Sequence, residues 1–288
     1  MASTLVIAHG SPKWWRSKAI WVTPVGAAST AAPGVPNPIA GHPYDVWVEV
    51  KNTSSTSVPV AELGYPPWQL NIWWAIPTAG PIPDTATTVI SETTLSEIDA
   101  GKTKVFKSVT PWTPSHGGHE CLIALTYNSA TGYPYSSYDG DLGPDINWSI
   151  AQHNLGVVQL GPHSPRRVNY VFQVCNSARE ERSFTVAARQ EPLSEVEWFM
   201  RGLPGGYQAH ERPGKVQNLG LVESERPDAS ELETAHPVLE HVKLAPSSCR
   251  KFTLVGTLDA GTALIDVTQT LDRRVVGGLS VLVLSAEK

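Results

Sequence analysis

Two histidines, a glutamate and a cysteine fall within "SHGGHEC", residues 115 to 121. These residue types can bind a transition metal, or they can pair a thiol nucleophile with a base. The stretch lacks the spacing of a zinc finger or of a His-Glu-x-x-His helix. If Cys121 opens a strand, consecutive side chains alternate between faces, so His119, Glu120 and Cys121 cannot converge on one ion. A thiol on an apolar strand face also stays protonated, which disfavours Cys121 as a nucleophile with His119 or His116 as its base. We interpret the stretch as a turn that leads into a strand.

The cluster "DGDLGPD" could offer carboxylate oxygens to a calcium ion from Asp139, Asp141 and Asp145. Its glycine and the position of its last acidic residue do not fit an EF-hand loop. We therefore favour a solvated turn, with a cation site as the alternative. The sequence favours no metal site and no cofactor, and the candidates that remain for a metal are these three aspartates with His116 and His119.

Aromatic residues are the third candidate for chemistry, because exposed rings on a β-sandwich can stack on sugars or form a protein interface. They gather in "KWWRS", "PPWQLNIWWAI" and "GYPYSSYDGD". We expect Trp47 and Trp73 to lie in the core. The candidates for an exposed binding surface are Trp14, Trp15, Trp68, Trp74, Tyr133 and Tyr135. For the group as a whole we favour core packing, with a protein interface as the second interpretation and glycan binding as the third.

Composition predicts a folded chain with many turns and no nucleic-acid footprint. The 288 residues are 41% hydrophobic and 17% charged, and they include 23 glycines and 24 prolines. The net charge of -5 comes without a long basic run, which argues against nucleic acid and anionic membranes as partners. Three cysteines, Cys121, Cys175 and Cys249, are an odd number, so we expect buried reduced thiols, with a Cys175–Cys249 bridge as the alternative.

The period of the apolar residues indicates an all-β protein of two tandem antiparallel β-sandwich domains. Alternation in "YDVWVEVKN", "CLIALTY" and "RVNYVFQVCN" is typical of half-buried strands, and convincing amphipathic helices are absent. Nine of the ten tryptophans precede residue 160, whereas Arg16 is the only one of twelve arginines to do so. We place a Trp-rich sandwich domain at 1–160, closed by the strand "NLGVVQL", and a second sandwich at 161–288.

The segment 203–237 is the exception within the second domain, because it is rich in charge, glycine and proline and too long for an ordinary connection. We expect it to be a mobile arm or to be held by a partner. Its interface candidates are Glu211, Arg212, Glu223 and Arg226, together with Glu225. The apolar C-terminal strand "LSVLVL" could also pair with another chain.

The first half resembles the CARDB-like immunoglobulin modules of bacterial surface and particle-associated proteins, most closely over residues 14–160. In such modules a Trp-Pro stretch leads into a strand that begins His-x-Cys-Leu, and an Asn, Ile-Ala-Gln, Asn stretch opens the last strand. The matching positions here are Trp112, His119, Cys121, Leu122, Asn147, Ala151, Gln152 and Asn154. The resemblance implies a spacer, an adhesion unit or an assembly subunit.

We therefore expect a non-enzymatic protein that works through protein contacts, as a subunit of a homo-oligomeric assembly or as a surface structure. The alternative is a carbohydrate-binding module that uses the exposed aromatics, and a metal-dependent hydrolase comes third. The sequence shows no phosphate loop, nucleophile elbow or dinucleotide fingerprint. With neither a signal peptide nor an apolar run long enough for a membrane span, we expect synthesis in the cytoplasm, with the protein either part of a particle or exported without an N-terminal signal.

Overall fold

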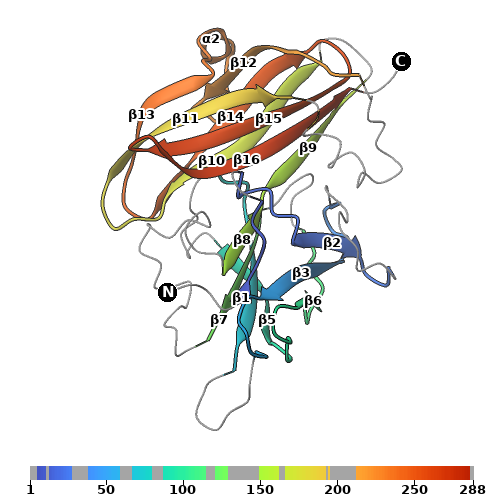
Figure 1. The fold of residues 1–288 in the computed structure, drawn as a ribbon. Coiled ribbons are helices and arrows are strands. Elements are labelled where there is room, and N and C mark those ends of the chain that lie inside the picture. Colours follow the sequence, from blue (N-terminus) through green and yellow to red (C-terminus); the bar gives the residue numbers. More distant parts are fainter. Residues whose placement is uncertain are drawn as a thin grey trace.

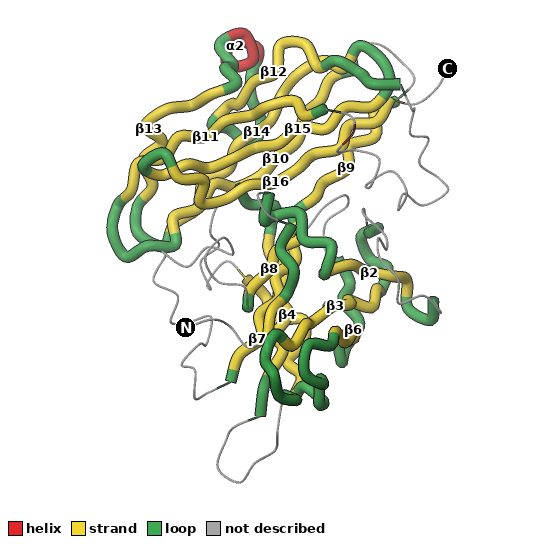
Figure 2. Tube along the Cα trace, in the orientation of Figure 1, coloured by secondary structure: helices red, strands yellow, loops and turns green. Residues whose placement is uncertain are grey.

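The computed structural model describes residues 5–10, 13–27, 38–58, 67–79, 87–114, 121–128, 149–161, 166–192, 194 and 212–285. These residues form an all-β structure, and they contain one short α-helix, α2 (Ala229–Glu233). Figure 2 shows strands running through both parts of the molecule, with α2 at an outer edge. The all-β expectation is confirmed.

The first sandwich packs two four-stranded sheets against each other. In one sheet β3 (Tyr44–Asn52) pairs with β1 (Leu5–Val6), β2 (Ile20–Pro24) and β6 (Thr103–Lys107). The other sheet has the order β5 (Thr87–Thr94), β4 (Gln69–Ala75), β7 (Cys121–Tyr127) and β8 (Ile150–His153). The core between the two sheets holds the valines predicted to share one face of β3, namely Val46, Val48 and Val50.

Strand β7 is buried on both faces, which the sequence did not lead us to expect. Leu122 and Ala124 point into the core between the sheets. Cys121, Ile123 and Leu125 share the other face, where they form a separate apolar cluster with Trp73. The apolar face that carries the Cys121 thiol is therefore turned away from the core between the two sheets.

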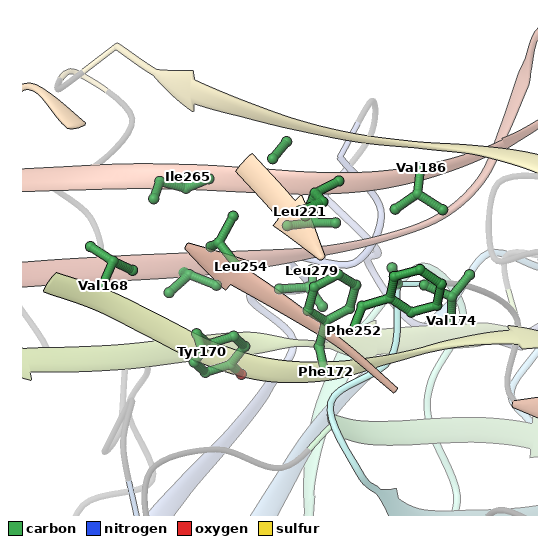
Figure 3. Close-up of a cluster of buried hydrophobic side chains, with 14 of the residues drawn as sticks. Val168, Tyr170, Phe172, Val174, Val186, Leu221, Phe252, Leu254, Ile265 and Leu279 are labelled. Carbon is green, nitrogen blue, oxygen red and sulfur yellow. The ribbon is translucent and has the colours of Figure 1, made fainter. Parts of the chain in front are cut away.

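The second sandwich packs a three-stranded sheet against a five-stranded one. The smaller sheet has the order β10 (Arg167–Asn176), β14 (Ser248–Leu258) and β12 (Val216–Val222). The larger has the order β13 (Val238–Leu244), β11 (Arg182–Glu191), β15 (Thr262–Leu271), β16 (Arg274–Ser285) and β9 (Leu155–Leu160). Figure 3 shows the core between them, where the rings of Phe172 and Phe252 stack with their centres 6.0 Å apart.

The two sandwiches repeat one pairing scheme. The order β5-β4-β7-β8 in the first corresponds to β13-β11-β15-β16 in the second, and the pair β3–β6 corresponds to β10–β14. Both β3 and β10 end in a buried asparagine that fixes the following turn. Asn52 Nδ2 donates to the carbonyls of Thr56 and Ile98, and Asn176 Nδ2 donates to those of Glu180 and Leu244. Asn52 and Asn176 are thus structural residues at equivalent turns.

We expected "NLGVVQL" to close the first sandwich, but strand β9, which it forms, does not. Only Asn154 separates it from β8, but β9 crosses to the second sandwich and pairs in parallel with β16, from Ser280↔Leu155 to Ser285↔Leu160. Figure 1 shows the chain passing directly from β8 into β9. The change of sandwich therefore falls at residue 154 rather than at 160.

The part of segment 203–237 that the structure describes, residues 212–237, is not a free arm. It supplies β12, which pairs with β14, and the capped helix α2. The carbonyl of Ser224 accepts a hydrogen bond from Thr253 Oγ1, which fastens the turn after β12 to β14. The C-terminal strand is likewise not available for pairing, because β16 lies between β15 and β9.

Cys175 and Cys249 form a disulfide, so our expectation of three reduced thiols is wrong for this pair. The two residues are directly opposite in the β10–β14 register, and their Cα atoms are 4.1 Å apart. Spacing in the sequence could not reveal this, because the two cysteines are 74 positions apart. Cys121 is the free cysteine and is buried.

We predict that reducing the disulfide destabilises the second sandwich. Closing a loop of this length restricts the unfolded chain and contributes about 2 to 4 kcal/mol to the free energy of unfolding. Thermal unfolding of the Cys249→Ser variant, compared with the wild type with and without a reducing agent, measures the effect. Equal melting temperatures for all samples would show that the bridge does not form.

Candidate functional site: the junction between the sandwiches

The polar side chains that the fold brings together lie at the junction between the two sandwiches. Residues 13–17 precede β2 and lie against the outward face of β15 and β16. Arg16 Nη2 forms a buried ion pair with Asp266 Oδ1 on β15, with the two side chains 8% and 3% exposed. Lys13 Nζ lies 2.8 Å from Glu191 Oε2 and 3.3 Å from Asp266 Oδ2. The four charges of this group balance.

The Ser280 hydroxyl on β16 connects this charge group to Trp15. It donates to Asp266 Oδ1 at 2.7 Å, and it accepts from Arg16 Nε at 2.7 Å and from Trp15 Nε1 at 3.0 Å. One donor and two acceptor positions are all that a hydroxyl offers, so the group is fully satisfied. A Cβ atom at Gly278 would lie 2.5 Å from Trp15 Cδ2, so glycine leaves the room that the indole needs.

Asn154 holds the point where the chain changes sandwich. It is completely buried. Its side-chain Nδ2 donates to the carbonyls of Thr78 and Gly278, at 2.6 and 2.8 Å. Its backbone N–H donates to Trp15, and its carbonyl accepts from the Ser280 N–H. Asn154 therefore binds both sandwiches at once.

A second backbone connection crosses the junction at the edge of β10. Ala79 N–H donates to the Gln173 carbonyl, and Gln173 N–H donates to the Pro77 carbonyl. Thr78 and Gln173 form a parallel bridge. Residues 77–79 thus cover part of an edge that would otherwise present unpaired backbone groups.

The titratable groups of β7 and β8 are suited to structure and not to catalysis. Burial raises the pKa of Cys121 to about 12, although Gln152 Nε2 donates a hydrogen bond to its sulfur. The thiol therefore stays protonated at neutral pH and is a poor nucleophile. Burial lowers the pKa of His153, which is 2.9 Å from the Ser17 carbonyl through Nδ1. His153 is accordingly a neutral donor.

The aromatic residues that we assigned to an exposed surface lie elsewhere. Trp14 and Trp15 are both 3% exposed, so this part of the assignment is wrong, and Trp15 is part of the junction. Trp68 and Trp74 are half-buried and pack against the first core. Tyr133 and Tyr135 lie outside the described residues.

The interface candidates are also explained in part by contacts within the chain. Glu223 forms an ion pair with Arg250, and Glu225 lies 2.9 Å from Lys251. Arg212 and Arg226 are exposed, while Glu211 lies outside the described residues.

The metal candidates Asp139, Asp141, Asp145, His116 and His119 are likewise outside the described part of the chain. Within that part, no group of three or more histidine, cysteine or acidic side chains is placed to hold a metal ion. No helix there is long and apolar enough to cross a membrane.

Sequence reasoning missed the junction, although two signals pointed to it. Asp266 is a lone carboxylate in the apolar strand "TALIDVTQTL", and a charge in such a strand needs a buried partner. Arg16 is the only arginine in the first 160 residues and lies in "KWWRS". What the sequence does not give is that these two residues, 250 positions apart, meet.

No family model and no curated protein matches this sequence. Among solved structures, red sea bream transglutaminase is 14% identical, with a TM-score of 0.25, over 87% of this chain and 30% of that chain. The CupB6 tip adhesin from Pseudomonas aeruginosa is 9% identical, with a TM-score of 0.24, over 93% of this chain and 98% of that one. Escherichia coli alpha-2-macroglobulin activated by porcine elastase is 8% identical, with a TM-score of 0.24, over 94% of this chain and 22% of that one. Likeness at this level carries no functional argument.

We predict that Asp266→Asn strongly destabilises the protein, because it leaves the buried Arg16 guanidinium without its counter-charge. Loss of one partner of a buried ion pair costs about 3 to 5 kcal/mol. Chemical denaturation gives the value. The double variant Arg16→Met, Asp266→Leu removes both charges and should recover most of the loss. A double variant as unstable as Asp266→Asn would show that the pair itself is not the source.

We also predict that acid weakens the junction through His153. The folded pKa is lowered, so below the unfolded value of about 6.5 the unfolded chain binds the proton and the folded protein does not. Stability from this group is fully present above that pH and is lost as the pH falls below it. The control is His153→Asn, whose amide can still donate to Ser17. Denaturation between pH 5 and 8 should show a shallower pH dependence for the variant, and identical curves would contradict the assignment.

Proposed function

We propose that this protein is a non-enzymatic interaction protein, which works as a subunit of a homo-oligomeric assembly or as a surface module. The observation that carries the proposal is the junction, because it fixes two sandwiches in one arrangement. A protein with two rigidly related surfaces loses little conformational entropy when it binds, which favours regular assembly. The likeness to CARDB-like modules, which rests on sequence motifs alone, agrees with such a role.

The titratable side chains considered for catalysis or binding, where the structure describes them, have structural roles, and this supports the proposal. The Cys121 thiol is protonated and His153 is neutral. The negative charge of Asp266 is paired with the positive charges of Arg16 and Lys13. The alternative of a glycan-binding surface loses Trp14, Trp15, Trp68 and Trp74, which are buried or packed against the core. We therefore do not carry that alternative further.

We place the contact surface of the assembly on the side of the first sandwich where β5 meets the segment after β6. Val109 there is 68% exposed and Val89 on β5 is 52% exposed. The N–H of Val109 donates to Ser91 Oγ on β5, two positions along that strand from Val89. Exposed apolar side chains that gather in this way mark contact sites more often than scattered ones do.

We predict that the purified protein is an oligomer, with a native mass of two or more times 31.1 kDa by size-exclusion chromatography with light scattering. The double variant Val89→Lys, Val109→Lys should shift the mass toward the monomer, because each lysine must then be desolvated in the contact. The matched control is Val275→Lys, an exposed valine on the second sandwich, which should leave the mass unchanged.

A monomer at every concentration would contradict self-association. A multimer that the double variant leaves intact would contradict the surface and keep the assembly.

A further inference from the structure

The first and last strands of the second sandwich run side by side in the same direction. Strand β9 enters from the first sandwich, and β16 is the last strand that the structure describes. Six residue pairs join them, from Ser280↔Leu155 to Ser285↔Leu160. β9 and β16 are the one parallel pair among the named strands of the described chain.

This arrangement determines how the sandwich responds to tension. A force that pulls the first sandwich away from the end of β16 draws β9 toward its N-terminal end and β16 toward its C-terminal end. The two strands must then slide along each other. Hydrogen bonds of a parallel ladder are spaced evenly along the strands, so all of them share a load in this direction. A force that peels a strand from its end would break them one after another.

The junction strengthens the ladder at the end where the load enters. The Ser280 N–H bond to the Asn154 carbonyl continues the ladder by one residue, and Asn154 Nδ2 holds the Gly278 carbonyl beside it. Trp15 and Arg16, which belong to the first sandwich, hold the Ser280 hydroxyl. Sliding β16 away from the first sandwich would therefore also break the hydrogen bonds that Trp15 and Arg16 donate to Ser280.

We propose that the β9–β16 ladder and the Asn154 junction together form a load-bearing clamp, which transmits tension between the first sandwich and the C-terminal end of β16. The clamp deepens the proposed function and rests on it, because an assembly subunit or surface module is a protein on which its neighbours pull. Such a clamp resists a force that slides β9 along β16 more strongly than a force that peels one strand from its end.

The test stretches the full-length protein with optical tweezers in two directions. One handle is fixed at Lys104→Cys, on the exposed strand β6. The second handle is either fused after the last residue, which shears β9 along β16, or fixed at Arg273→Cys in the turn between β15 and β16. Cys121 does not interfere, because it is buried.

We expect the C-terminal handle to give an unfolding force at least about twofold higher than the Arg273 handle, because the bonds of the ladder then break together. The native disulfide identifies the sandwich that unfolds. It locks a 74-residue separation, so a reducing agent should lengthen the unfolding step of the second sandwich by roughly 250 Å at about 3.4 Å per residue. Equal forces for the two handles would overturn the clamp.

Two neighbouring proline variants test the ladder itself. In the alternation that begins with the Ser280 bond to Asn154, the N–H of Val158 points at β16, whereas that of Gln159 points away from it. Val158→Pro should reduce the force measured with the C-terminal handle, and Gln159→Pro should retain it. A reduced force in both variants, or in neither, would contradict the proposal.

The melting temperatures of the two proline variants show whether a reduced unfolding force reflects the ladder alone or a general loss of stability. If Val158→Pro does not fold, the comparison of the two handles on the wild-type ladder still decides the question. A protein that assembles but shows equal forces keeps the proposed function and loses the clamp, so the two failures are distinguishable.

Discussion

The buried ion pair between Arg16 and Asp266 is the contact on which the arrangement of the two sandwiches depends. Removing two charges from water is costly, and the cost is offset only where the geometry is fixed and every remaining donor and acceptor is satisfied. Here Ser280 and Lys13 complete the set. A shift of one sandwich against the other would separate the two charges, so the buried pair favours the observed arrangement.

The same constraint accounts for features that otherwise look like binding chemistry. The two adjacent tryptophans of "KWWRS" are buried, and Trp15 donates a hydrogen bond to the Ser280 hydroxyl that also contacts the ion pair. Gly278 is small because Trp15 lies against it. Asn154 replaces a linker, so β8 continues into β9 without a hinge. The first sandwich thus contributes to the second a strand, an ion-pair partner and a cover for part of the edge of β10.

Several edge strands are covered by other segments or carry bulges and lysines, which oppose backbone pairing with another chain. Within the described chain, residues 13–17 cover the edge of β8 through Ser17, and residues 77–79 cover part of β10. Edge strands β12 and β13 carry irregularities with positive φ at Asn218 and His241, and β6 carries exposed lysines. Bulges and lysines at edges oppose pairing with another chain. Pairing of another chain with these edges is therefore disfavoured.

Local patterns predicted the strands well, and long-range contacts escaped prediction. The alternation in "YDVWVEVKN" and "RVNYVFQVCN" determines β3 and β10, because a half-buried strand needs one apolar face. The assignment of "NLGVVQL" to the first sandwich failed, since its partner β16 begins more than 100 residues later. The disulfide, the ion pair and the burial of Trp15 were not predicted from the sequence, for the same reason. Each depends on which strands meet, and the side-chain pattern of one strand does not specify its partner.

If the Arg16–Asp266 junction holds the two sandwiches as one rigid unit, the distance between them is fixed. Spin labels at Val105→Cys on β6 and Lys251→Cys on β14, two exposed sites outside the junction, allow that distance to be measured by pulsed electron resonance in frozen solution. We expect a single narrow distribution that does not change with salt, since the ion pair is buried. A broad or multiple distribution in the wild-type protein would contradict it.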